Sequence, residues 1–258
     1  MTAAKVISGA EHFFLPGNSI GILICHGFNG TPQSVRYLGE NFAARGFTVF
    51  APRLAGHGTD ENEMETSHYR DWIQDVEAAY AELKKTCTKV FAIGQSMGGA
   101  LVLDLATKVA CDGILTINAA LKVPEYEKYR NQSVPRFIPE GKPDIKAENV
   151  NEIAYDRVPT KAVNQLLDIM QHTSTRLQRI TCPLMLFHSP DDHVVPDRCS
   201  HQIYETVMSD DKEMVSLDNS YHVASLDHDK DYIIEQTHRF IQKHTKQANS
   251  APLTSLII

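Results

Sequence analysis

The sequence predicts an α/β domain with a mostly parallel central sheet and helices on both faces of that sheet. Three observations lead to this fold class. Short β-rich runs alternate with longer helical patterns along the 258 residues. Several of the runs are apolar throughout, as expected of strands that are covered on both sides. The order strand, helix, strand is typical of parallel sheets, which bind ligands beyond the carboxyl ends of their strands.

Six strands are expected, each from a short apolar or β-branched run. They cover residues 19–25, 47–52, 89–94, 113–118, 183–189 and 213–218. A helix is expected over 99–110, directly after the third run. Three more helices are indicated by apolar stripes at helical spacing, which are most simply core packing. The stripes consist of Trp72, Val76, Ala79, Tyr80 and Leu83, then Val163, Leu166, Leu167 and Met170, and finally Ile233, Thr237, Phe240 and Ile241.

The segment 121–160 interrupts this regular alternation. It contains five prolines among mixed apolar and charged residues, namely Pro124, Pro135, Pro139, Pro143 and Pro159. A small cap over the strand ends is the favoured interpretation, and a plain long connection is the alternative. We expect residues 1–247 to form one domain that includes this insertion. The ending, residues 248–258, is expected to be a flexible tail outside it.

Composition and charge exclude several function classes. The chain has 25 Lys and Arg against 32 Asp and Glu, a net charge of -7, so neither nucleic acid nor an anionic membrane surface is an expected partner. The longest apolar run, residues 20–25, is far too short to span a bilayer, and no signal peptide is evident. Five widely spaced cysteines match neither a disulfide framework nor a zinc motif. We therefore expect reduced thiols and a cytoplasmic protein.

A serine lies in a glycine-rich turn at the end of the third predicted strand. The stretch "FAIGQSMGGAL" places Ser96 between Gly94 and Gly98, and a helical pattern follows. Strand, sharp turn and helix are the context of a nucleophile elbow, in which the turn lifts the serine out of the sheet. A structural turn that happens to contain a serine is the alternative.

A serine hydroxyl needs a base and an orienting carboxylate, and in such enzymes the carboxylate follows the serine along the chain and the histidine comes last. The run at 183–189 is followed by "PDDHVVP", and the run at 213–218 by "NSYHVASLD". These loops supply Asp191 or Asp192 as the acid and His222 as the base. Spacing alone does not separate the two aspartates.

An oxyanion hole is also expected. The first apolar run leads into "HGFNG", where glycines allow backbone N–H groups to face the site. The expected donors are the amides of Phe28 and of Met97, the residue after Ser96 at a helix N-terminus.

The stretches "HGFNGTPQS", "PRLAGHGT", "GQSMGG", "SPDDHVVP" and "NSYHVASLD" together resemble the α/β-hydrolase superfamily, in particular its bacterial monoacylglycerol lipase and small carboxylesterase group. The resemblance runs from about residue 10 to 245. It implies Ser96 as nucleophile, Asp192 rather than Asp191 as acid, His222 as base, and the amides of Phe28 and Met97 as oxyanion donors. It also implies a short cap that shapes the acyl pocket. Asn29 departs from the family pattern, in which threonine is frequent.

The function expected from these residues is hydrolysis of esters with a single acyl chain, foremost monoacylglycerol, without a cofactor or metal. A general short-chain carboxylesterase, a thioesterase or acyltransferase, and a hydrolase-fold protein that binds a ligand without turnover remain alternatives. The expected partner is a small lipid or ester, with transient contact to lipid aggregates. The oligomeric state stays open.

Other polar residues receive a structural interpretation. His188, Asp191, Asp192 and His193 invite comparison with a metal site, but no wider ligand set is evident in the sequence. His26 and His57 are expected to make structural hydrogen bonds in their glycine-containing loops. Cys25, inside an apolar strand, is expected to be inert packing.

Overall fold

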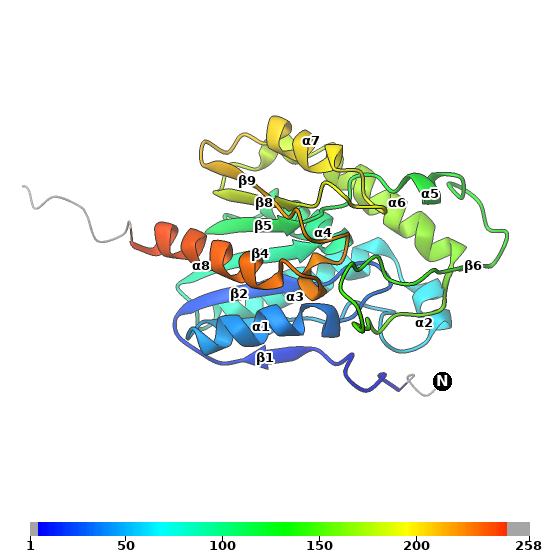
Figure 1. Ribbon diagram of the computed structural model, residues 1–258, viewed down its shortest axis with the longest axis horizontal. Coiled ribbons are helices and arrows are strands. Elements are labelled where there is room, and N and C mark those ends of the chain that lie inside the picture. Colours follow the sequence, from blue (N-terminus) through cyan, green and yellow to red (C-terminus); the bar gives the residue numbers. More distant parts are fainter. Residues whose placement is uncertain (1–4, 247–258) are drawn as a thin grey trace, which may run out of the picture.

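The computed structural model describes residues 5–246, and the predicted tail, residues 248–258, lies outside the described residues. Within these bounds the central sheet has seven strands in the spatial order β1-β3-β2-β4-β5-β8-β9 (Figure 1). All pairs are parallel except β1 with β3. The strands are β1 (Phe13–Leu15), β2 (Ile20–Cys25), β3 (Thr48–Ala51), β4 (Lys89–Gln95), β5 (Gly113–Ile117), β8 (Leu184–His188) and β9 (Lys212–Ser216).

The six predicted strands are all present, and the predicted fold class is confirmed. The strand β1 was not predicted, because three residues at the edge of the sheet are too few to show a periodicity. Four of the α-helices of the described residues and the two short strands within 121–160 were not predicted either. The helices are α1 (Gln33–Ala44), α2 (Glu61–Thr66), α3 (Tyr69–Lys84), α4 (Met97–Ala106), α5 (Pro124–Glu127), α6 (Thr160–Ser174), α7 (Arg198–Thr206) and α8 (Lys230–Lys246), with short 3-10 turns at Leu177–Arg179 and Ala224–Leu226.

Helices cover both faces of the sheet. In Figure 1, α1 and α8 lie in front of the strands, and α3 and α4 lie behind them. The side chains of β2 alternate accordingly: Ile22 and Ile24 pack in the core beneath α1 and α8, whereas Leu23 and Cys25 pack in the core beneath α3, α4 and α6. The three predicted stripes lie on α3, α6 and α8, and all of their members are buried. Burial on both faces explains why these strands lack polar alternation.

The segment 121–160 lies near the carboxyl ends of the parallel strands (Figure 1). It carries α5 and a two-stranded antiparallel sheet of β6 (Phe137–Pro139) and β7 (Arg157–Pro159). We call this segment the cap segment, although its action as a cap stays a prediction. Among residues 5–246, no helix combines the length and the apolar character that crossing a membrane requires.

Candidate active site

Ser96 occupies a sharp turn between β4 and α4. Its φ of 55° and ψ of -119° fall outside the regions that non-glycine residues prefer. A Cβ on Gly94 would lie 2.1 Å from the Gly98 carbonyl oxygen, and a Cβ on Gly98 would lie 2.4 Å from that of Cys25. Only glycine fits at both positions, so the turn can bring α4 against β2 and β4 while it raises Ser96 above the strand ends. This is the predicted elbow geometry.

His222 lies in the loop after β9 and reaches the serine directly. Its Nε2 is 2.9 Å from Ser96 Oγ, and both side chains are almost buried. The loop is held from within by the buried Asp227, whose carboxylate accepts hydrogen bonds from Tyr221 N at 2.9 Å and His228 N at 2.8 Å. The same carboxylate accepts hydrogen bonds from Lys146 N and Ala147 N, and so joins this loop to the cap segment.

The structure distinguishes Asp192 from Asp191, which spacing along the chain did not. Asp192 Oδ2 is 2.7 Å from His222 Nδ1, and its side chain is 1% exposed. Its other oxygen, Oδ1, accepts hydrogen bonds from Val194 N and Val195 N, each at 2.8 Å. Asp191 is exposed. The arrangement therefore brings together Ser96, His222 and Asp192, in agreement with the residues that the resemblance implies.

The electrostatic surroundings of His222 suit a general base. Burial by itself disfavours the imidazolium, but the charge of Asp192 and the hydrogen bond to it outweigh this cost, with further contributions from Asp144 and Glu152. The net result is a raised pKa for His222. An imidazole with a raised pKa holds a proton more firmly once it has received one from the serine.

Asn118, directly after β5, connects the loop that carries Asp192 to the loop that carries His222. It was not predicted as a site residue. Its Nδ2 donates to Ser189 Oγ at 3.0 Å and to the His222 carbonyl at 2.9 Å, and its Oδ1 accepts from Ser189 N at 2.7 Å. Its φ of 48° is one that asparagine tolerates better than most residues. An asparagine at a strand end in a parallel sheet was the only signal in the sequence.

The loop after β2 approaches the serine from the other side. A Cβ on Gly27 would lie 3.3 Å from the Ser96 Cβ. Within residues 5–246, neither the Phe28 amide nor the Met97 amide donates a hydrogen bond to another protein group. Asn29, the position that departs from the family pattern, exchanges two hydrogen bonds of 3.0 Å with the backbone of Tyr155 and so fastens this loop to the cap segment.

A cavity of about 240 Å³ opens onto Ser96 and His222. The cap segment contributes Tyr126, Glu140 and Glu152 to the walls of the cavity. Loops outside the cap segment contribute apolar side chains such as Phe28 and Val194. Burial raises the pKa of Glu152 to about 7, although the charge of His222 and a hydrogen bond from Ser34 act in the opposite direction. Glu152 is a second site residue that sequence reasoning missed, because nothing in the chain distinguishes it from other cap carboxylates.

The structural interpretation of the two loop histidines agrees with the structure. His26 Nε2 accepts a hydrogen bond from Leu54 N at 3.2 Å, and His57 Nδ1 lies 3.0 Å from the Ala55 carbonyl. Burial lowers the pKa of His26 to about 3 and that of His57 to about 4, so both are neutral at physiological pH. Burial also raises the pKa of the Cys25 thiol, which keeps it protonated and poorly nucleophilic.

The four residues that the sequence analysis compared with a metal site do not come together. Asp192 faces His222, and His193 pairs with Asp144 of the cap segment at 2.9 Å. Of these four residues, only His188 belongs to a group that could hold a metal ion. In the described part of the chain this group consists of His188, Asp197 and His201.

Comparison with known families adds an independent observation. The family model described as Serine aminopeptidase, S33 (Hydrolase_4) matches residues 19–229, which include all five stretches on which the resemblance rests. The chain belongs to this family. It is therefore a member of the α/β-hydrolase superfamily, and the prediction that it is a hydrolase is confirmed.

Relatives cover almost the whole chain. The thermostable monoacylglycerol lipase of Bacillus sp. (strain H-257) is 43% identical over 93% of this chain and 97% of its own length. The carboxylesterase of Bacillus subtilis (strain 168) is 28% identical over 93% of this chain and 98% of its own length. A solved structure from work on LipS and LipT, two metagenome-derived lipolytic enzymes, superimposes with a TM-score of 0.90 at 43% identity and covers 93% of this chain and 100% of that chain.

Proposed function

We propose that this hydrolase cleaves carboxylic esters that carry one acyl chain, foremost monoacylglycerols, through an acyl-enzyme on Ser96. One observation carries the proposal above all others. Ser96 Oγ lies 2.9 Å from His222 Nε2, and the opposite nitrogen of the same imidazole lies 2.7 Å from Asp192 Oδ2. These are the contacts that a serine needs in order to become a nucleophile at neutral pH.

In the acylation step, His222 Nε2 removes the hydroxyl proton as Ser96 Oγ bonds to the ester carbonyl carbon. The carbonyl electron pair moves onto oxygen, where the free amides of Phe28 and Met97 are available to donate hydrogen bonds. Asp192 holds Nδ1 protonated and stabilises the imidazolium without taking its proton. The intermediate then collapses, the bond to the alcohol oxygen breaks, and His222 protonates the departing alcohol.

In the deacylation step, His222 Nε2 takes a proton from water, and the resulting hydroxide attacks the acyl carbon. The second intermediate collapses with cleavage of the bond to Ser96 Oγ, which regains its proton from His222. The products are the carboxylic acid and the free enzyme.

The chemistry of the cavity walls supports a substrate with a single chain and a polar alcohol. Phe28, Tyr126 and Val194 offer apolar surface to an acyl group, whereas Glu152 offers a carboxyl group to alcohol hydroxyls. A volume of about 240 Å³ lies below the usual range of about 300–1,000 Å³ for ligand pockets, which argues against a triacylglycerol. The similarity to the Bacillus monoacylglycerol lipase points in the same direction.

The small volume also favours a second candidate, a carboxylesterase for short acyl esters, which would use the same three residues. The two candidates differ in the length of acyl chain that the cavity admits. Hydrolysis of glycerol esters and of simple alkyl esters, each over a series of chain lengths, distinguishes them by the position of the maximum in kcat/KM.

The test of the nucleophile is mass spectrometry after treatment with a fluorophosphonate, with glycerol release from a monoacylglycerol followed in the same samples. We expect a single adduct on Ser96 in the wild type, and neither an adduct nor glycerol release in Ser96→Ala. Ser19→Ala, an exposed serine before β2, is the matched control and should behave as the wild type. A Ser96→Ala protein with full turnover would refute the mechanism, and an adduct without glycerol release would favour the short-ester candidate.

We further infer a reducing compartment such as the cytoplasm. Cys25, Cys87, Cys111, Cys182 and Cys199 are all free thiols, and four of them are buried. Proteins of oxidising compartments commonly carry disulfides, whereas five free thiols fit a reducing one. Cell fractionation tests the inference: we expect the protein in the fraction that carries a cytoplasmic marker, and its recovery outside that fraction would contradict the proposal.

A further inference from the structure

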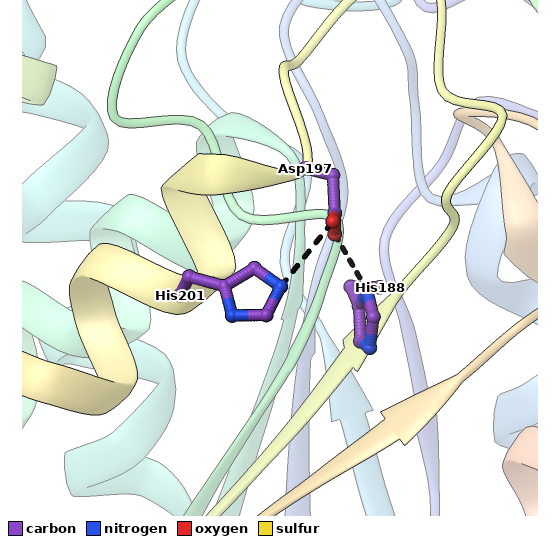
Figure 2. A group of neighbouring side chains, drawn as sticks. All are labelled: His188, Asp197 and His201. Carbon is purple, nitrogen blue, oxygen red and sulfur yellow. Dashed lines mark hydrogen bonds and ion pairs between the residues drawn. The ribbon is translucent and has the colours of Figure 1, made fainter.

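A cluster of two histidines and one aspartate lies at the base of the loop that carries Asp192. His188 is the last residue of β8, Asp197 directly precedes α7, and His201 is one turn further along that helix. Figure 2 shows the Asp197 carboxylate between the two imidazole rings. His188 Nδ1 lies 2.6 Å from Asp197 Oδ1, and His201 Nε2 lies 3.3 Å from Asp197 Oδ2.

We propose that this cluster is a binding site for a divalent transition-metal ion, Zn²⁺ foremost, with His188, Asp197 and His201 as ligands and water in the fourth position. Two imidazole nitrogens and one carboxylate oxygen form a ligand set that zinc accepts in proteins. Hard cations such as Mg²⁺ and Ca²⁺ prefer oxygen ligands only, so two histidines select against them. The site is separate from Ser96 and does not depend on the proposed esterase function.

The spacing of the three side chains fits such an ion after small rotations. Candidate ligand atoms of the three residues all lie within 4.8 Å of one another. In a tetrahedral zinc site with bonds of about 2.1 Å, neighbouring ligand atoms are about 3.4 Å apart. His188 and Asp197 must therefore separate slightly, and His201 must move slightly inward. His201 can make this movement because its side chain is 54% exposed.

The cluster is also accessible to an ion from solution and attractive to it. Side-chain exposure rises from 13% at His188 to 33% at Asp197 and 54% at His201, so one side of the cluster is open to water. The imidazole nitrogens and the carboxylate oxygens of the cluster are all atoms that can donate a lone pair to a cation. The contact between His201 and Asp197 is partly exposed to water, so little is lost when bonds to a metal replace it.

The position of the site gives metal binding a structural consequence. His188 and Asp197 are the two ends of the loop 189–196, and this loop holds Asp192 with the Val194 and Val195 amides. An ion bound by both ends would restrain the loop from its base. We therefore expect bound Zn²⁺ to make opening of the loop 189–196 less frequent.

The test uses the whole protein, freed of metal by a chelator, and competition between the protein and a chromophoric chelator for Zn²⁺. We expect one zinc ion per wild-type chain. His201→Gln should weaken binding by more than about 10- to 100-fold, since even residues that only support a metal ligand have effects of that size. His12→Gln is the control, because it removes an exposed histidine that lies far from the cluster in the sequence, and it should leave the zinc affinity unchanged.

Co²⁺ provides a second readout, because its visible absorption reports the ligand geometry directly. The wild type and His12→Gln should show the intense bands of a four- or five-coordinate ion, and His201→Gln should lose them. Equal zinc affinity in the wild type and His201→Gln would overturn the site, and so would a loss of affinity in His12→Gln of the same size. Amide exchange over 189–196 that zinc does not slow in the wild type would overturn the restraint of the loop.

Discussion

Replacement of Asp192 by asparagine isolates the role of its charge, because the side chain keeps its shape. Asp192 Oδ1 accepts hydrogen bonds from Val194 N and Val195 N, each at 2.8 Å. In Asp192→Asn only the amide oxygen can accept these two bonds, so the amide NH₂ group must face His222. The NH₂ group is a donor, and His222 Nδ1 must then become an acceptor.

This change places the imidazole proton on Nε2, the nitrogen that lies 2.9 Å from Ser96 Oγ. In that tautomer His222 cannot take the serine proton. We expect kcat to fall by about 10⁴-fold, as for the same exchange in other serine hydrolases. This corresponds to about 5.4 kcal/mol in the activation free energy.

The assay is steady-state hydrolysis of a monoacylglycerol and of a chromogenic short-chain ester, with thermal unfolding measured on the same preparations. Asp191→Asn is the matched control, since it removes the same charge from the adjacent, exposed position and should retain wild-type activity. The reasoning is refuted if Asp192→Asn stays within tenfold of the wild type while folded, or if Asp191→Asn loses as much activity.

Three further predictions concern residues around this centre. His222 must be neutral to act, so kcat/KM is lost as the pH falls through the raised pKa of His222. Glu152→Gln removes a charge that raises this pKa, so the acid limb of the pH profile of kcat/KM should move to lower pH. A move to higher pH would contradict the assignment. Gly98→Ala forces a Cβ to 2.4 Å from the Cys25 carbonyl oxygen, so the free energy of unfolding measured in urea should fall by about 3 kcal/mol or more. A fall of less than about 1 kcal/mol would disprove this expectation. Asn118→Ala leaves the buried Ser189 amide without its acceptor, which should lower the free energy of unfolding by about 1–3 kcal/mol and also lower kcat. The control is Asn131→Ala, because Asn131 is exposed and also has a positive φ, of 60°. This control should lower neither the stability nor kcat to that extent.

Local patterns in the sequence determined the parallel sheet and the turn at Ser96. Apolar runs without alternation indicate strands that are buried on both faces, and the glycines at 94 and 98 indicate a turn too close to its neighbours for any side chain. Both signals are carried by adjacent residues, so they can be recognised before the fold is known. The edge strand β1 escaped recognition because its three residues are too few to form such a pattern.

Contacts between distant segments were decided only by the tertiary structure. Asp191 and Asp192 are equivalent in spacing, and the choice between them depends on which carboxylate turns inward to meet His222, thirty residues away along the chain. Asn118, Glu152 and the cluster around His201 escaped recognition for the same reason. The function of each depends on neighbours that only the sheet and the cap segment bring close, and hydrogen bonds and metal coordination depend on those distances rather than on residue order.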